Sequence, residues 1–228
     1  MRLALALLLL VAAPALAQPS ASSVVEAWRA DWRQAAQGVA GIDAREEAEW
    51  TIDGPRGRTV VEADGRIRYT RGRPERDLDR VRVNGRDVPP DRGRGQGQRW
   101  QRAFGPAGRE VHAPPPLPVA LLGSAEPDRV EADREGGVAA WRVAFDARVG
   151  RAEAWFTRSG APRLLRLRVE GDRPRGGRFT HDVRYARVRG LDLPARSQTT
   201  FTVRQRRRLR NYLVTLRADA TYTDHTLR

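Results

Sequence analysis

Apolar and polar residues alternate with a period of two along most of the chain after Gly41. Near the start of this region, Ala48, Trp50 and Ile52 are separated by a glutamate and a threonine, and similar alternation recurs up to the C-terminal residues. Successive side chains of a β-strand point to opposite faces of the sheet, so each such segment predicts a strand with one apolar face. We therefore expect a mainly β fold, a curved antiparallel sheet or half-barrel meander of roughly nine to twelve strands.

Turn-forming residues separate these segments. Asn84-Gly85 lies between two alternating segments and is the strongest hairpin signal in the chain. Residues 190–194, Gly-Leu-Asp-Leu-Pro, are expected to turn the chain again. In the stretch 201–224, the arginines at 204 and 206–208 mark the end of one strand and the turn into the next. Because aromatic residues do not interleave with these arginines, the stretch predicts two long antiparallel strands rather than a surface for single-stranded nucleic acid.

One segment before the alternating region has the spacing of a helix. Ser23 can cap this helix, Glu26 completes a capping box three residues later, and Gly38 is a natural stop. We predict one amphipathic helix over residues 23–37, packed on the concave side of the sheet. Its apolar face consists of Val25, Trp28, Trp32 and Ala35.

Two stretches interrupt the alternation. Residues 90–99 are rich in glycine and arginine and are interpreted as a flexible loop. Residues 114–124 begin with prolines, which cannot donate the hydrogen bonds of a sheet, so this segment should lie outside the sheet. Its large side chains must still be buried, and the concave face is the nearest dry surface. We name residues 114–124 the cover segment and expect either a static plug or a movable lid, with these side chains turned inward: Leu117, Val119, Leu121 and Leu122.

The first residues have the pattern of a secretory signal. Arg2 precedes an apolar run, and Ala15-Leu16-Ala17 gives the pattern of a signal-peptidase site, with cleavage expected before Gln18. We expect a signal peptide over residues 1–17, a single domain over 18–228, and a periplasmic or secreted protein that is not integral to a membrane. A barrel of membrane-spanning strands is the chief rival architecture, because such strands also alternate, but no aromatic girdles are evident.

The basic residues bear on the choice of partner. All 42 residues counted as Lys+Arg are arginine, and with 28 Asp+Glu they give a formal charge of +14. Such a charge favours nucleic acid, but an exported protein meets little of it, so we expect no nucleic-acid partner. Anionic lipid head groups are a possible partner outside the cytoplasm, and a solvated arginine surface is the simpler alternative. The chain has no cysteine, which excludes disulfides and thiolate chemistry.

No motif in the sequence specifies a reaction. The three histidines are far apart, and the neighbours His181 and Asp182 would point to opposite faces of a strand. Glu46 and Glu47 are adjacent at the start of a strand and are expected to face solvent. We therefore predict no metal site, no cofactor and no enzymatic activity. The alternative is a hydrolase of an envelope polymer whose carboxylates meet in the concave face.

The order of these elements resembles a known family, the periplasmic lipoprotein-carrier (LolA/LolB-like) fold family. The matching stretches are the Val24–Gln37 helix, the insert Pro118-x-x-Leu121-Leu122, and the consecutive strands around VAAWRVAFDAR, RAEAWFTRSG and PRLLRLRVEGD. The resemblance implies a curved sheet or half-barrel covered by helices, and a soluble carrier in the cell envelope.

We expect a carrier-like, exported and soluble binder of an apolar ligand, which is a lipid, an acyl chain or a lipoprotein. A module that binds a protein partner through a sheet edge is a further alternative. Apolar residues of the alternating segments are candidates for a ligand-binding concave face, although the same residues would also serve as a filled core. They are Trp50, Ile52, Tyr69, Trp141, Val143, Phe145, Leu165, Leu167, Phe201, Tyr212 and Val214.

Overall fold

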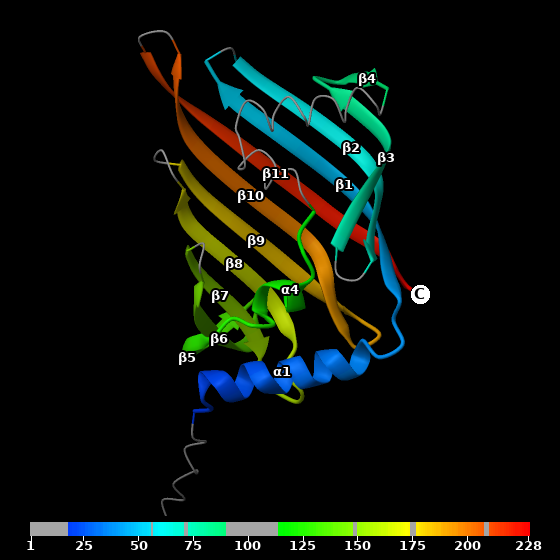
Figure 1. The fold of residues 1–228 in the computed structure, drawn as a ribbon, viewed down its shortest axis with the longest axis vertical. Coiled ribbons are helices and arrows are strands. Elements are labelled where there is room, and N and C mark those ends of the chain that lie inside the picture. The colour runs from blue at the N-terminus through cyan, green and yellow to red at the C-terminus, as the bar shows by residue number, and fades with distance from the viewer. Residues whose placement is uncertain are drawn as a thin grey trace, which may run out of the picture.

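Most of the chain forms one antiparallel sheet. The computed structural model describes residues 18–55, 57–70, 73–89, 114–147, 150–173, 177–207 and 210–228, so the expected signal peptide at 1–17 and the expected loop at 90–99 lie outside the described residues. Within them, eleven strands join in the order β4-β3-β2-β1-β11-β10-β9-β8-β7-β6-β5 (Figure 1), which confirms the expected mainly β fold. The strands are β1 (Gly41–Gly54), β2 (Gly57–Thr70), β3 (Arg73–Val83), β4 (Arg86–Val88), β5 (Pro127–Glu135), β6 (Val138–Ala147), β7 (Gly150–Thr157), β8 (Leu164–Arg173), β9 (Gly177–Val188), β10 (Leu191–Arg207) and β11 (Arg210–Leu227).

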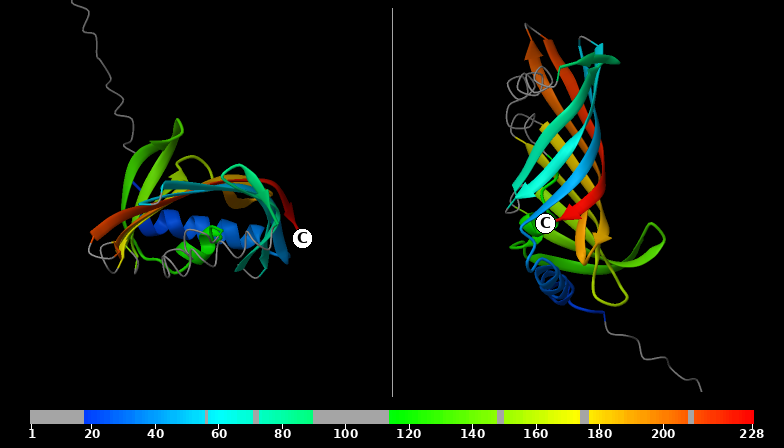
Figure 2. Two further views of the ribbon diagram at one scale, coloured as in Figure 1. Left: turned by 90° about the horizontal axis from the view of Figure 1, so that it is seen from above. Right: turned by 90° about the vertical axis from the view of Figure 1, so that its right-hand side faces the viewer.

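The first and last of these strands pair with each other. β1 and β11 run antiparallel, from Ile42 opposite Leu227 to Asp53 opposite Thr215. The other neighbours among the described strands are consecutive in sequence, so the two edges of the sheet are β4 and β5. The chain that connects these edges includes the cover segment, which lies on the concave side of the sheet (Figure 2).

Alternation along each strand separates an apolar concave face from a charged outer face. On β1, Ala48 and Trp50 are buried whereas Glu47 and Glu49 are exposed. The pairing continues the apolar side across neighbouring strands, since Trp50 lies opposite Ala218 of β11, which is also buried. The buried side faces the concavity, where both described helices lie (Figure 2).

One predicted turn and one predicted pair of long strands are confirmed. Asn84 and Gly85 connect β3 to β4 with positive φ angles of 50° and 76°, as a tight hairpin turn requires. β10 ends at Arg207 and β11 begins at Arg210, so the arginine run marks the end of one long strand and the start of the next.

The N-terminal helix, α1 (Ala21–Ala35), lies across one end of the concave face (Figure 1). The predicted helix is confirmed, but the predicted cap at Ser23 is wrong. The Oγ of Ser20 accepts the hydrogen bond from the Ser23 amide at 3.1 Å, so the helix begins earlier than expected. Trp28 is fully buried and packs against Phe156, with ring centroids 5.7 Å apart. No helix among the described residues is long and apolar enough to cross a membrane.

A buried carboxylate fixes α1 to the sheet. Asp192 of β10 accepts hydrogen bonds from Trp28 Nε1 and from the Leu164 amide, each at 2.9 Å. Its second oxygen accepts from Arg187 Nη1 at 3.2 Å, and Arg187 also pairs with Asp31 of α1. The carboxylate thereby joins α1, β8 and β9 at one point.

The expected turn over residues 190–194 is wrong in its position, because the strand pairing places the turn earlier in the chain. Arg189 and Gly190 make the turn, and β10 begins directly afterwards, with Leu191 opposite Val188 of β9. Asp192 is therefore a strand residue that is 1% exposed rather than a solvated turn residue. The contacts that bury it come from elements distant in sequence, so the local pattern did not predict its role.

We expect Asp192→Ala to lower the free energy of unfolding by about 3–5 kcal/mol, because it leaves the Trp28 N–H and the Leu164 amide without their shared acceptor and removes one partner of Arg187. Urea unfolding followed by tryptophan fluorescence measures this loss. Asp219→Ala is the control: Asp219 is 49% exposed and pairs with Arg196 at 4.0 Å. That variant should lose less than about 1 kcal/mol. Equal losses in the two variants would contradict the anchoring role.

A histidine inside the sheet gives the fold a pH dependence. His181 of β9 has Nδ1 2.7 Å from Thr199 Oγ1, and its Nε2 is buried without a hydrogen-bond partner among the described residues. Burial lowers the pKa of His181 to about 4, and the charge of Asp182 opposes the shift only in part. The ring therefore stays neutral in the folded protein at pH values at which the unfolded chain binds a proton.

We expect the protein to lose stability as the pH falls from about 7 to about 4, by up to about 1.4 kcal/mol per pH unit from this residue alone. The sign follows because the unfolded state binds the proton near the ordinary pKa of about 6.5 and the folded state only near the lowered value. Urea midpoints measured across this range check the slope. His181→Leu should flatten it, and an unchanged slope in the variant would rule out His181 as the cause.

Candidate functional site

The predicted ligand-binding residues mostly form one buried cluster on the concave face. All of them except Leu165 and Tyr212 belong to the hydrophobic core or pack directly against it. Leu165 is half-buried, because a register shift between β7 and β8 pairs Phe156 with Leu164 and buries Leu164 in its place. Tyr212 is half-buried near the start of β11. The apolar face is thus a packed surface whose side chains are mostly shielded from solvent.

The cover segment contains a short helix, α4 (Pro118–Leu122). Leu117 and Leu122 are buried, with exposures of 4% and 1%, and Val119 packs partly buried against the core. The expectation that all the large side chains turn inward is wrong for Leu121, which is 37% exposed. Successive residues of a helix point about 100° apart, so Leu121 faces outward when Leu122 faces the sheet.

Polar contacts tie the cover segment to the sheet and to α1. The Arg29 guanidinium of α1 donates to the Leu122 carbonyl at 2.6 and 3.1 Å and to the Ala125 carbonyl at 2.6 Å. On the other side, the Tyr69 hydroxyl of β2 donates to the Pro115 carbonyl at 2.9 Å. All the acceptors are main-chain oxygens, so the ties fix the path of the backbone. Sequence reasoning missed Arg29, because no local pattern distinguishes it among so many arginines.

A buried ion pair joins β1 and β3 on the concave face. Arg76 Nη2 donates to Glu46 Oε1 at 2.6 Å, and Arg76 Nε donates to the other carboxylate oxygen. The Glu46 side chain is 1% exposed and that of Arg76 is 11% exposed. Gly65 of β2 lies opposite Glu46, so no side chain of β2 intervenes at that position. The Arg76 guanidinium also lies over the Trp50 ring, 5.1 Å from its centroid.

The expectation that Glu46 and Glu47 both face solvent is wrong for Glu46. Strand alternation puts Glu46 on the same face as Ala44 and Ala48, and Glu47 alone of the two glutamates is exposed. An isolated carboxylate would be costly to bury, but Arg76 supplies the compensating charge from a strand later in the sequence.

Tyr69 and Tyr222 lie near this ion pair, and Tyr185 lies near Tyr69. We name Tyr69, Tyr185 and Tyr222 the tyrosine cluster. Tyr222 of β11 lies opposite Glu46, and its hydroxyl is 3.0 Å from Ser197 Oγ. Burial, followed by the charge of Glu46, raises the pKa of Tyr69 and of Tyr222 above its usual range. Burial, followed by the nearby Tyr69 hydroxyl, raises the pKa of Tyr185 in the same way. The three phenols are therefore uncharged hydrogen-bond donors at physiological pH.

A hollow of about 1030 Å³ adjoins the ion pair and the cover segment. Its lining includes Arg76 and also Pro114, the first residue of the cover segment. The hollow therefore brings solvent to the polar end of the concave face, next to the point where the cover segment begins. Most of its other lining residues are charged, with both signs present: Asp43, Arg45, Arg66, Arg68, Glu75, Asp77, Asp79 and Asp224.

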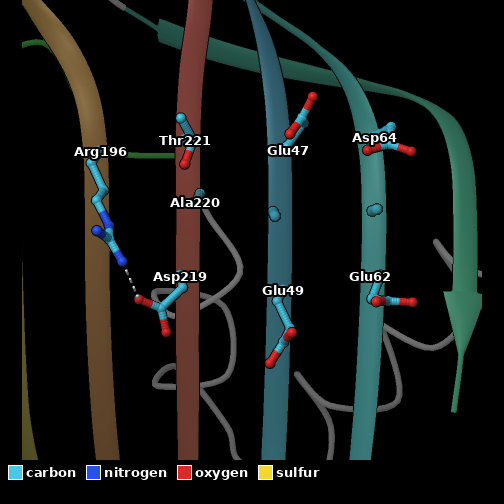
Figure 3. Close-up of a pocket in the computed structure, with 10 residues that line it drawn as sticks. Glu47, Glu49, Glu62, Asp64, Arg196, Asp219, Ala220 and Thr221 are labelled. Carbon is cyan, nitrogen blue, oxygen red and sulfur yellow. Dashed lines mark ion pairs between the residues drawn. The ribbon is translucent and has the colours of Figure 1, made fainter. Parts of the chain in front are cut away.

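A separate, acidic hollow of about 260 Å³ lies on the outer face (Figure 3). Cross-strand neighbours there carry like charges, with Glu49 opposite Glu62 and Glu47 opposite Asp64. Within the part of the chain that the structure describes, no group of three or more acidic or histidine side chains is arranged to hold a metal ion. We therefore assign no binding role to this hollow.

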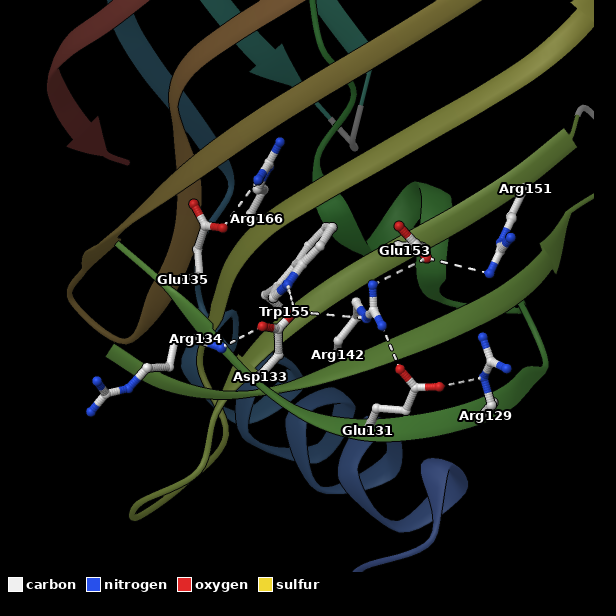
Figure 4. A network of polar contacts seen from close by, with 10 residues as sticks. All are labelled: Arg129, Glu131, Asp133, Arg134, Glu135, Arg142, Arg151, Glu153, Trp155 and Arg166. Carbon is white, nitrogen blue, oxygen red and sulfur yellow. Dashed lines mark hydrogen bonds and ion pairs between the residues drawn. The ribbon is translucent and has the colours of Figure 1, made fainter. Parts of the chain in front are cut away.

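The outer face of the sheet at the β5 edge carries a network of ion pairs (Figure 4). Arg142 of β6 contacts Glu131 and Asp133 of β5 and Glu153 of β7. These side chains are partly exposed, and exposed pairs of this kind contribute about 0–1 kcal/mol each. The network links edge strands on the face opposite to the cover segment, so it is separate from the covered site.

No protein-family model and no curated protein matches this chain significantly. Solved structures with a similar arrangement of elements include a putative outer membrane lipoprotein-sorting protein domain from Vibrio parahaemolyticus, with 10% identity, coverage of 91% of this chain and 93% of that chain, and a TM-score of 0.46. A DUF1329 family protein from Desulfovibrio piger has 9% identity, coverage of 89% and 92%, and a TM-score of 0.36. MucB in complex with MucA(peri) has 13% identity, coverage of 88% and 93%, and a TM-score of 0.23.

The first of these neighbours is of the class that the sequence resemblance named. At these identities and scores, the likeness carries no argument about what this chain binds. The function has to be inferred from the covered concave face itself.

Proposed function

We propose that this chain binds an apolar ligand, which is a lipid, an acyl chain or a lipoprotein, beneath the cover segment on the concave face. The observation that carries the proposal is a wide apolar sheet face that is closed in part by a short proline-led segment. Hydrogen bonds from Arg29 and Tyr69 hold that segment by its Leu122 and Pro115 carbonyls, and Arg29 also holds the adjoining Ala125 carbonyl. These bonds are not part of the strand pairing of the sheet. The proposed lining consists of the residues expected from the sequence that belong to the buried cluster or pack against it, which leaves out Leu165 and Tyr212.

The energies involved are compatible with a cover that opens. Leu117 and Leu122 are the fully buried leucines of the cover segment, and their burial contributes about 3–6 kcal/mol together. A ligand chain contributes about 0.8 kcal/mol for each methylene that it buries, so roughly four to eight buried methylenes offset the exposure of both leucines. The ligand would take over the contacts that the cover makes in its absence.

The cellular setting follows from the N-terminal sequence and remains part of the proposal. We infer that residues 1–17 are removed as a signal peptide and that residues 18–228 act as a single domain in the periplasm or outside the cell. Anionic lipid head groups are an additional candidate partner for the arginine-rich surface, and no nucleic acid is proposed as a partner.

The hydrolase alternative gains no support from the buried carboxylates. Among the described residues, the carboxylates buried below one tenth exposure are Glu46 and Asp192. Glu46 is paired with Arg76, and Asp192 is paired with Arg187 and accepts two further hydrogen bonds. Carboxylates held in this way serve as structural anchors rather than as a free acid and base.

Purified mature protein tests the proposal directly. Lipids that co-purify with it are extracted and identified by mass spectrometry, and the delipidated protein is titrated with a pyrene-labelled alkane. We expect co-purifying acyl lipids and saturable binding of the probe with a rise in its fluorescence. A protein that carries no lipid and also leaves the probe unbound would refute the proposed function.

We expect Arg29→Gln to speed uptake of the pyrene-labelled alkane, because it removes the guanidinium that holds the Leu122 and Ala125 carbonyls. Stopped-flow fluorescence measures the rate. Arg33→Gln is the matched control: Arg33 lies one turn later on α1 and donates to the Arg29 carbonyl of its own helix. Arg33→Gln should leave the rate unchanged. If Arg29→Gln also left it unchanged, the ties to the cover segment would not limit uptake.

The leucine pair of α4 separates a lid from a static plug. For a lid, Leu122→Ala should speed probe uptake while lowering the free energy of unfolding by less than about 2 kcal/mol, below the range of a core leucine. Leu121→Ala should alter neither quantity, because its side chain is already 37% exposed. A loss of about 2–5 kcal/mol from Leu122→Ala with unchanged uptake would instead identify a plug.

A further inference from the structure

The Tyr185 hydroxyl is a polar group that the packing of the described residues does not satisfy. It is buried, and no hydrogen-bond partner lies within reach among them. Leaving a buried hydroxyl unpaired costs roughly 1–3 kcal/mol of folding free energy. Replacing it with an apolar group would therefore stabilise the protein, unless the hydroxyl forms a hydrogen bond when the protein is at work. Phenylalanine would fill the same space without this penalty, so the hydroxyl calls for an explanation.

The charged groups that act on Tyr185 are already paired. After burial, the largest electrostatic influences on its hydroxyl come from Tyr69, Asp192 and Asp182, and Asp182 is bound by Arg166. Asp192 is engaged by Arg187, and Glu46 nearby on the same face is engaged by Arg76. Arg187 is shared by Asp192 and Asp31, and Arg76 is bound by Glu46, so each of these two cations is already held by a carboxylate. What the tyrosine cluster offers a ligand is therefore an uncharged O–H.

The site lies where a ligand under the cover segment would end. Tyr69 of the tyrosine cluster holds the Pro115 carbonyl of the cover segment, and Arg76 beside it lines the solvent-filled hollow. The apolar residues of the concave face extend away from this polar end. A chain lying along the apolar face would thus bring its head to the tyrosine cluster.

We propose that Tyr185, supported by Tyr69 and Tyr222, forms a subsite that donates a hydrogen bond to one uncharged acceptor on the ligand, the carbonyl of an ester or amide. This inference rests on the proposed function and specifies the ligand head. When the cover segment opens, the Tyr69 hydroxyl is released from the Pro115 carbonyl and becomes a second donor. Tyr222 keeps its hydrogen bond with Ser197, which holds the Tyr222 side chain in place beside the other two tyrosines.

The same site discriminates against a carboxylate. A free fatty acid would bring a negative charge into a buried region where Arg76 is already bound by Glu46, and Arg187 by Asp192 and Asp31. Burying an uncompensated carboxylate costs far more than burying an ester, because the ester loses only part of its hydration. We therefore expect esters and amides of long-chain acids to bind more tightly than the corresponding free acids.

Three pyrene-labelled ligands of matched chain length test the subsite on the full mature chain. They are an alkane without an acceptor, the methyl ester of the matching alkanoic acid, and the free acid at about pH 8, where the acid is ionised. We expect the wild-type protein to bind the ester at least about tenfold more tightly than the free acid. Tyr185→Phe should weaken ester binding about five- to tenfold and leave alkane binding within about twofold.

Stability measurements guard against a misfolded variant. Tyr185→Phe removes an unpaired hydroxyl, so its urea midpoint should equal or exceed that of the wild-type protein. Tyr222→Phe, which breaks the bond to Ser197, is the matched control and should lower the midpoint.

The possible results separate the two proposals. Unchanged ester affinity in Tyr185→Phe, with the alkane still bound, would overturn the subsite and leave the proposed function intact; a hydroxyl satisfied by buried water would give this result. Free acid bound as tightly as ester would overturn the preference for an uncharged head. Failure of the wild-type protein to bind any of the three ligands would overturn both proposals.

Discussion

When the first and last strands of a meander pair with each other, the free edges of the sheet come from the middle of the sequence. Here β1 and β11 are long and pair over almost the whole of β1, so the edges are β4 and β5. These edge strands are consecutive in the chain, yet they lie at opposite sides of an eleven-stranded sheet. The two edges are therefore separated by the width of the sheet, and the described part of the chain between them, the cover segment, lies on the concave side.

The position of the cover segment explains why the concave face has both an apolar and a polar part. The cover segment brings its own prolines and leucines to the apolar side chains, but its main-chain carbonyls have no strand to pair with. Arg29 and Tyr69 satisfy some of those carbonyls. A buried carbonyl left unpaired would cost about as much as a lost hydrogen bond, so a cover of this kind requires donors on the elements that it touches. Opening the cover frees the same donors.

The sequence predicted the fold better than it predicted the site. Period-two alternation correctly assigned the apolar side chains of β1, and those of β11 from Val214 onward, to the concave face, because burial on one side of a strand is a local property. Leu165 was assigned wrongly because a register shift between β7 and β8 changes which neighbour is covered. Glu46 and Asp192 were missed for a different reason: a charged residue on a dry face is permitted only by a distant partner, and no local pattern identifies that partner. Arg29 donates hydrogen bonds to the cover segment from α1, yet no pattern in the sequence distinguishes it from the other arginines.

Arginine without lysine also matters at the level of individual contacts. Arg76 binds both oxygens of Glu46 while its planar guanidinium lies over Trp50, and Arg29 reaches two main-chain carbonyls at once. A lysine ammonium lacks the planar fork that makes such combined contacts possible. Arginines committed in this way do not present free charge to an outside partner, so the formal charge overstates how basic the concave side is. The polar end of the covered face can consequently be rich in charged groups and still offer a ligand only neutral hydrogen-bond donors. The proposed selection of a ligand with an uncharged head depends on this condition.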